Sequence, residues 1–144
     1  MTCPACDGDR VAFAVPASLR PYAPDESPRA TICTGCLRVS AIDAAGDGPD
    51  ESMTEADPED RETEVGWEPL PTGEAGVATA LLVGLLDSLA LRRTEITALV
   101  DHAEAAGGDP LSALDRLSGL AATGEVDPYV DLDRRAAQLR SMLA

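Results

Sequence analysis

The only four cysteines of this 144-residue chain stand as two matched pairs, Cys3/Cys6 and Cys33/Cys36. Two residues separate the cysteines of each pair, so both thiolates of one tight turn can point at a single ion about 2.3 Å from each sulfur. The stretch between the pairs is long enough for a hairpin that brings the two turns together. The spacing therefore predicts one tetrahedral metal site with four cysteine ligands, and structural zinc as its ion.

Three other uses of paired cysteines are less consistent with the sequence. A disulfide framework is typical of secreted chains, and no signal peptide precedes Cys3. A thioredoxin-like redox pair needs one such motif between a strand and a helix, and this chain has two motifs without that pattern. Iron sites of the rubredoxin type carry glycine after each pair and an aromatic-rich shell. Here Asp7 and Leu37 follow the pairs, and Phe13 and Tyr22 are the only nearby aromatics, which favours zinc and leaves iron open.

The charge of the chain is strongly acidic and unevenly distributed. Asp and Glu number 26 against 11 basic residues, a net charge of −15, and every basic residue is arginine. Residues 1–42 are balanced, residues 43–68 carry eleven acids against one arginine, and residues 69–144 carry eleven acids against six. An acidic composition without lysine resembles that of halophilic archaea that accumulate salt, because molar salt screens the self-repulsion. We therefore expect a halophilic cytoplasm.

These charges and the hydrophobic pattern predict an α+β protein in three parts. Residues 1–42 read as a small β-rich zinc module, with strand patterns at 11–15, 29–32 and 37–42. Residues 43–68 are rich in Gly, Pro, Asp and Glu, hold no period and predict an acidic disordered linker that ends at Trp67. Residues 69–144 predict a helical domain, onto which Trp67 packs.

Four helix signals follow one another in the C-terminal part. The first helix is predicted over 72–91 with Thr72 as its cap, and the second from a Thr94 cap to Gly107. Asp109-Pro110 and Asp127-Pro128 give two further start signals, since proline is favoured at the first helical position. Short connections between apolar helix faces predict a compact bundle of about four helices.

No catalytic or cofactor-binding residue is predicted. His102 is the only histidine, and no nucleophile is identifiable to pair with it. Four cysteines on one ion leave no open position for metal-assisted hydrolysis, and no phosphate loop or dinucleotide motif occurs. The longest apolar stretch, Val77 to Leu86, is far shorter than the roughly 20 residues of a membrane span. The sequence predicts a non-enzymatic, cytoplasmic protein without a membrane partner.

The CPAC and CTGC pairs in a β-rich N-terminal module resemble the zinc ribbons, over about residues 1–42. The segments GEAGVATALLVGLLDSLALRR, GGDPLSALDRL and DLDRRAAQLRSML are similar to a family of small uncharacterised proteins of halophilic archaea. That family joins such a ribbon to a helical end. The resemblance implies a ligand role for the four cysteines and brings no activity with it.

Two functions fit these observations. The first is a protein-interaction or regulatory adaptor, in which the ribbon and the helices are two docking surfaces for an unidentified protein partner. The second is a zinc ribbon that binds nucleic acid or acts in transcription. It would use Arg10, Arg20, Arg29 and Arg38, but the acidic charge of the chain disfavours it. If the parts fold separately, replacing any cysteine should melt residues 1–42 and spare the helices.

Overall fold

The computed structural model describes residues 3–4, 6–41 and 65–143. Its N-terminal part is a three-stranded antiparallel sheet in the order β1-β2-β3. The strands are β1 (Arg10–Ala14), β2 (Arg29–Cys33) and β3 (Val39–Ala41), and the short helices η1 (Ala17–Tyr22) and η2 (Pro24–Glu26) connect the first two. The predicted strands are thereby confirmed, although the third is shorter. It begins after Leu37, whose φ of 69° is incompatible with a strand.

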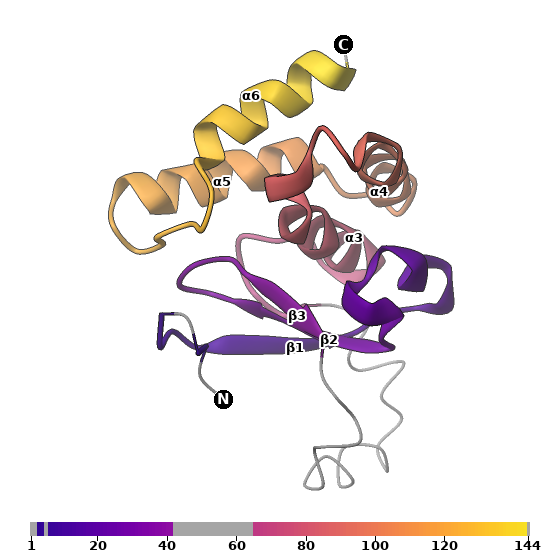
Figure 1. The fold of residues 1–144 in the computed structure, drawn as a ribbon, viewed down its shortest axis with the longest axis horizontal. Helices are drawn as coiled ribbons and strands as arrows, with labels where there is room; N and C mark the ends of the chain where they lie inside the picture. Colours follow the sequence, from indigo (N-terminus) through magenta and orange to yellow (C-terminus); the bar gives the residue numbers. More distant parts are fainter. Residues whose placement is uncertain (1–2, 5, 42–64, 144) are drawn as a thin grey trace, which may run out of the picture.

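Four α-helices form the C-terminal part. They are α3 (Gly73–Gly84), α4 (Arg93–Ala105), α5 (Pro110–Ala122) and α6 (Leu132–Leu143), and the short helix η5 (Leu86–Ser88) follows α3. All four lie on one side of the sheet, with α3 against it and α6 farthest from it (Figure 1). The predicted fold class, a small β-rich module with cysteine pairs followed by a bundle of four helices, is confirmed.

The first helix ends seven residues before the predicted Leu91. Gly84 lies directly on Val39 of the sheet, and a Cβ built on this glycine would stand 2.7 Å from the Val39 Cβ. Leu85 then leaves the helical conformation (φ −103°, ψ 1°) and η5 begins. Leu86 and Leu89 remain buried in this turn. Because the buried leucines continue through the turn, the apolar pattern extends beyond the helix itself.

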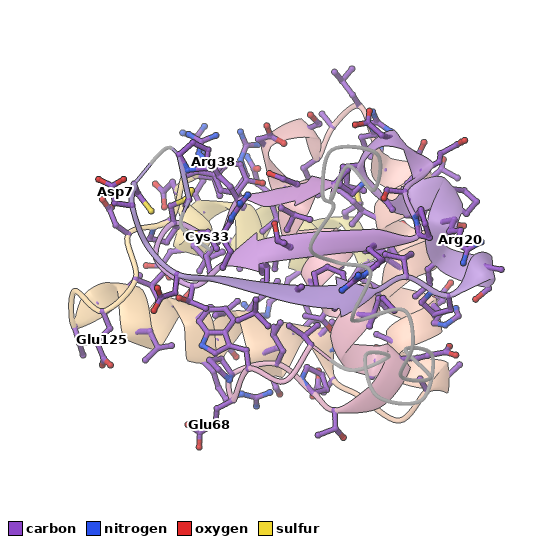
Figure 2. The ribbon with its side chains drawn as sticks, turned by 90° about the horizontal axis from the view of Figure 1, so that it is seen from below. Asp7, Arg20, Cys33, Arg38, Glu68 and Glu125 are labelled. Carbon is purple, nitrogen blue, oxygen red and sulfur yellow. The ribbon has the colours of Figure 1, made fainter. Side chains whose placement is uncertain are left out.

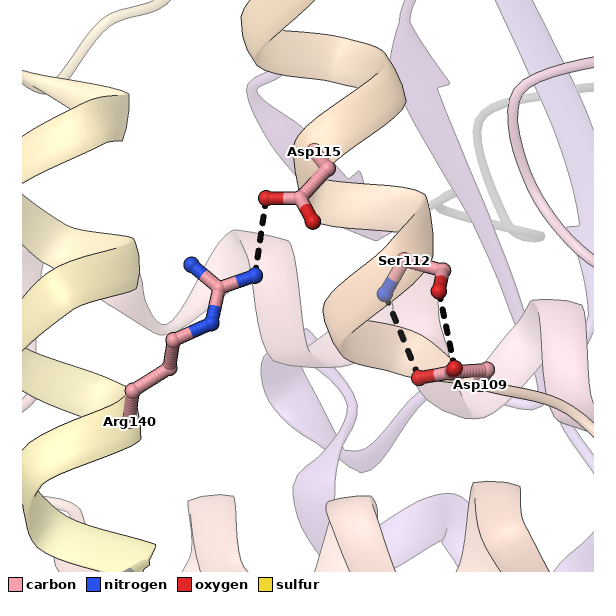
Figure 3. Close-up of polar contacts among 4 residues, drawn as sticks. All are labelled: Asp109, Ser112, Asp115 and Arg140. Atoms are coloured by element: carbon pink, nitrogen blue, oxygen red, sulfur yellow. Dashed lines mark hydrogen bonds and ion pairs between the residues drawn. The ribbon is translucent and has the colours of Figure 1, made fainter.

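The predicted helix caps have different outcomes. Thr72 is the N-cap residue of α3 as predicted, but its side chain makes no capping hydrogen bond. The second helix starts at Arg93 rather than after Thr94. The Asp109 cap of α5 is confirmed, because its carboxylate accepts hydrogen bonds from the Ser112 N–H (3.2 Å) and hydroxyl (2.8 Å) (Figure 3). A cap needs a specific side-chain rotamer, which residue type alone does not determine.

Both parts share one continuous core. The inward side of the sheet contributes Phe13 and Ile32, both fully buried, to the same cluster as the helical leucines. Val65 is 2% exposed and Trp67 packs against this cluster, which confirms the predicted packing of the tryptophan. The end of the predicted linker therefore belongs to the fold. The rest of that linker, and Ile42, lie outside the described residues, and the domain boundaries at 42 and 69 stay a prediction.

None of the helices in the described part of the chain has the length and hydropathy needed to cross a bilayer.

Candidate metal centre

The fold brings all four cysteine sulfurs to one end of the sheet. Their Sγ atoms lie within 4.8 Å of one another, with 3.8 Å between Cys3 and Cys36 and 3.4 Å between Cys6 and Cys33. Four sulfurs arranged tetrahedrally at about 2.3 Å from one ion are about 3.8 Å apart. The donor set therefore fits a tetrahedral ion of this size. Cys33 lies at the end of β2, in the same region as Asp7 and Arg38 (Figure 2).

Each pair is held by the same backbone turn. In the first, the Asp7 N–H donates to the Cys3 carbonyl (2.8 Å). In the second, the Leu37 N–H donates to the Cys33 carbonyl (2.9 Å). Asp7 and Leu37 both adopt the left-handed conformation, with φ of 63° and 69°. The two turns thus repeat one local structure, and each directs two sulfurs toward the same point.

This conformation changes how the sequence distinguishes zinc from iron. Asp7 and Leu37 occupy the position where rubredoxin-type sites carry glycine, and both take the positive φ that glycine favours. The absence of glycine after each pair is therefore a difference in residue type and not in backbone geometry. The four-sulfur arrangement suits zinc and iron alike, and the identity of the metal is left to measurement.

Backbone N–H groups point at the sulfurs inside both turns. The Gly8 N–H donates to Cys6 Sγ (3.4 Å), and the N–H groups of Gly35 and Cys36 donate to Cys33 Sγ (3.3 and 3.4 Å). Such donors stabilise thiolates over thiols. The same N–H donors would also stabilise a buried, negatively charged metal–sulfur centre, by hydrogen bonding to its ligand sulfurs.

Two glycines let the turns approach each other. A Cβ on Gly8 would lie 3.2 Å from the sulfurs of Cys6 and Cys33, and a Cβ on Gly35 would lie 3.3 Å from the Cys6 sulfur. Both distances are tighter than ordinary packing contacts. Gly35 also contacts Gly8 closely, because a Cβ built on Gly35 would lie 3.5 Å from the Gly8 Cα.

Bringing the sulfurs together raises the pKa of two thiols. Burial raises the pKa of the Cys36 thiol to about 12, and the thiols of Cys33, Cys6 and Cys3 add to this effect, against a hydrogen bond from the backbone of Arg38. At Cys6 the Gly8 N–H lowers the pKa, but the Cys33 thiol and desolvation outweigh it, and the net shift is upward. Four adjacent thiolates therefore need a cation to compensate their charge.

The centre is closed rather than open. Cys3, Cys33 and Cys36 are at most 5% exposed, and only Cys6 reaches the surface. Four protein donors fill a tetrahedral coordination sphere, which is typical of structural zinc sites and leaves no position for a substrate. None of the four cysteines forms a disulfide, since a sulfur–sulfur bond of about 2.05 Å is much shorter than the separations above.

The connection between α5 and α6 holds the second cysteine turn. The Asp127 N–H donates to the Gly35 carbonyl (2.6 Å) and the Tyr129 N–H donates to the Cys36 carbonyl (2.9 Å). The predicted helix start at Asp127-Pro128 is therefore wrong. Helix α6 begins at Leu132, because the backbone of this segment is engaged by the metal turn.

Tyr129 joins three parts of the molecule. Its hydroxyl donates to the Val83 carbonyl of α3 (2.8 Å), and the Arg38 guanidinium lies 5.2 Å from the centre of its ring. Burial, with Asp87 nearby, raises the pKa of Tyr129 above its ordinary value, so the hydroxyl remains a donor. The role of Tyr129 was not predicted from the sequence, since nothing in the local pattern around it points to cysteines ninety positions earlier.

Among the other polar residues considered from the sequence, Arg38 lies beside the centre and Arg20 lies far from it. Arg20 and Arg38 stand at opposite ends of the sheet (Figure 2), so the N-terminal arginines do not gather into one patch. His102 is partly buried, and its Nε2 lies 2.9 Å from the Glu74 carboxylate, which links α4 to α3. This contact is a structural one between two helices.

The model of a family of unknown function (DUF6276) matches residues 2–143. No curated protein and no solved structure matches the chain.

Proposed function

The chain belongs to the DUF6276 family, whose function is unknown, and from its four-cysteine centre we propose a non-enzymatic zinc protein that acts as an interaction adaptor. The single observation that carries the proposal is the convergence of four sulfurs within 4.8 Å, from two identical turns. The ion would be held by Cys3, Cys6, Cys33 and Cys36, and it would supply structural crosslinking rather than Lewis-acid chemistry.

The adaptor role is supported by what the ion would stabilise. The cysteine turns lie between the sheet and the α5–α6 connection. Backbone hydrogen bonds join the second turn to the sheet and also to this connection. A metal there holds the sheet and the helices in one relative position, which preorganises any surface that spans them. The acidic, lysine-free composition supports a halophilic cytoplasm as the setting.

Nucleic-acid binding is the alternative function. It needs several arginines on one face to neutralise phosphates, and the separation of Arg20 from Arg38 gives it no added support (Figure 2). Dissociation constants measured in molar potassium chloride with unrelated duplexes would test it directly.

The test of the metal centre is elemental analysis of the purified chain together with unfolding before and after chelation. We expect one zinc per chain, a colourless protein, and a lower unfolding temperature once a strong chelator has removed the ion. A coloured protein with one iron per chain would replace zinc with iron in this proposal. A fully folded protein with neither metal, and with no change on chelation, would overturn it.

A further inference from the structure

Residues of α4, of α6 and of the turn before α4 line an open surface groove. Figure 1 shows α6 as the helix farthest from the sheet. The groove consists of two adjoining hollows of about 560 and 350 Å³, which share Arg93 and Met142. The floor and walls of the groove are contributed by Leu89 and Ala90, by Thr97 and Ala98 of α4, and by Gln138 of α6. The groove is therefore part apolar and part polar.

An exposed leucine follows Ala90 of this groove in the chain, although its side chain does not line either hollow. Leu91 is 88% exposed, and no other large apolar side chain among the described residues is exposed. It lies between Ala90 and Arg93, both of which line the groove. Covering an exposed leucine is favourable, because it removes apolar surface from water. A partner segment that extends from the groove past Ala90 would also cover Leu91.

Four of the six arginines of the helical part distinguish the fold from the groove. Arg116 donates to the Pro69 carbonyl (2.9 Å) and Arg140 pairs with Asp115 across α5 and α6 (2.7 Å, Figure 3), so both serve the fold. Arg93 lines both hollows, and within the described part of the chain its side chain has no ion pair. Arg135 donates only to Gln138 (3.1 Å).

Two arginines without a carboxylate partner among the described residues thus line the groove of a chain whose net charge is −15. The one acid that lines the groove is Asp101, at its α4 end. Guanidinium groups recognise carboxylates through paired hydrogen bonds, and such contacts survive high salt better than long-range attraction does. The charge of the groove is thus complementary to an acidic ligand.

We propose that this groove binds an acidic amphipathic segment of a partner protein. Its carboxylates contact Arg93 and Arg135, and its aliphatic side chains cover Leu91 and Met142. Grooves between two helices commonly receive such segments. A second copy of this chain is a poorer occupant, because it would bring identical arginines to the same surface. The inference rests on the adaptor role proposed above and names the chemical class of the partner.

The experiment selects peptides from a displayed random library against the zinc-loaded full chain in molar potassium chloride. We expect the enriched sequences to combine Asp or Glu with Leu, Ile or Phe. Their affinity should fall about tenfold for Arg93→Glu and by a smaller factor for Leu91→Ser, since tenfold corresponds to the loss of one good charged contact. Both positions are exposed, so these variants should fold, and circular dichroism and zinc content verify this separately from binding.

Arg134→Glu is the matched control, because it makes the same charge change on α6 at an exposed residue that does not line the groove. We expect it to leave affinity within about twofold. Enriched peptides without acidic residues, or an equal loss for Arg93→Glu and Arg134→Glu, would overturn the proposal. So would a dimer in light scattering that Arg93→Glu converts to monomer, since the groove would then be a self-interface. None of these outcomes alters the metal content, so they are distinct from a failure of the zinc centre.

Discussion

The sheet and the helices are stabilised by different means. The strands β1, β2 and β3 contain five, five and three residues, too few to enclose a core, and their inward side chains are covered by the helices. Two cysteine turns close the far end of this sheet. The helical part instead buries leucines among α3, α4, α5 and α6. Four clustered cysteines therefore close the end of a sheet that cannot bury a core of its own, and each part depends on the other.

The largest expected effect is from Cys33→Ser, which removes a fully buried ligand. We expect loss of zinc and a fall in the free energy of unfolding on the order of 5 kcal/mol, since structural zinc binding is worth about 10–16 kcal/mol. The shared core further predicts that sheet and helices unfold in one transition, contrary to the expectation from sequence that the helices are spared. Thermal circular dichroism and zinc analysis measure both quantities.

Cys6→Ser is the control for that variant, because Cys6 is the exposed ligand and water can hydrate a serine there. It should weaken zinc binding with less loss of stability. An unchanged helical transition in Cys33→Ser, with the sheet signals lost from an NMR spectrum, would show instead that the two parts fold separately.

The contact of α3 with the sheet is tested by Gly84→Ala. The added Cβ would lie 2.7 Å from the Cβ of Val39, which cannot rotate away, so we expect a loss of about 1–3 kcal/mol in chemical denaturation. Gly119→Ala is the matched control on α5, where a Cβ meets nothing within 4 Å. It should gain up to about 1 kcal/mol from helix propensity. A gain at both positions would mean that the sheet is not held closely by α3.

Tyr129→Phe tests the link between the metal turn and α3 with a smaller change. It removes the hydroxyl that donates to the Val83 carbonyl and keeps the ring beneath Arg38. We expect a loss of about 1 kcal/mol in urea unfolding, together with faster zinc transfer to a chelator. If Tyr129→Phe has normal stability and an unchanged rate of zinc release, the Tyr129 hydroxyl does not couple the two parts.

The smallest effect is expected at Asp109, which lies wholly within the helical part. Hydrogen bonds from the Ser112 hydroxyl and N–H lower the pKa of Asp109. A lowered pKa means that this stabilisation is present above the unfolded pKa of about 3.9 and is lost as pH falls through the folded value. Asp109→Ala should lower the free energy of unfolding by about 1 kcal/mol near neutral pH. The difference in stability between this variant and the wild type should become smaller in acid. Asp109→Asn should retain the cap. A cost that is constant in acid would exclude the carboxylate as its source.

Much of the architecture was readable from local pattern. The period of apolar residues identified four helices, and alternating residues and turn signals identified the strands, because these signals depend on near neighbours in the chain. At two of the places where prediction failed, a distant contact is present. Leu85 ends α3 where Gly84 meets Val39, and Asp127 contacts Gly35 instead of starting a helix.

The sequence by itself determined the metal-binding chemistry, since two closely spaced cysteine pairs have few other uses, and it determined the charge and the order of the elements. Only the tertiary structure decided that the helices and the cysteine turns share one body, through Tyr129 and the continuous core. It also decided that Arg93 of α4 and Arg135 of α6 line the same groove. Spacing in the chain records which residues can form a local turn, whereas contacts across ninety residues depend on how the whole chain packs.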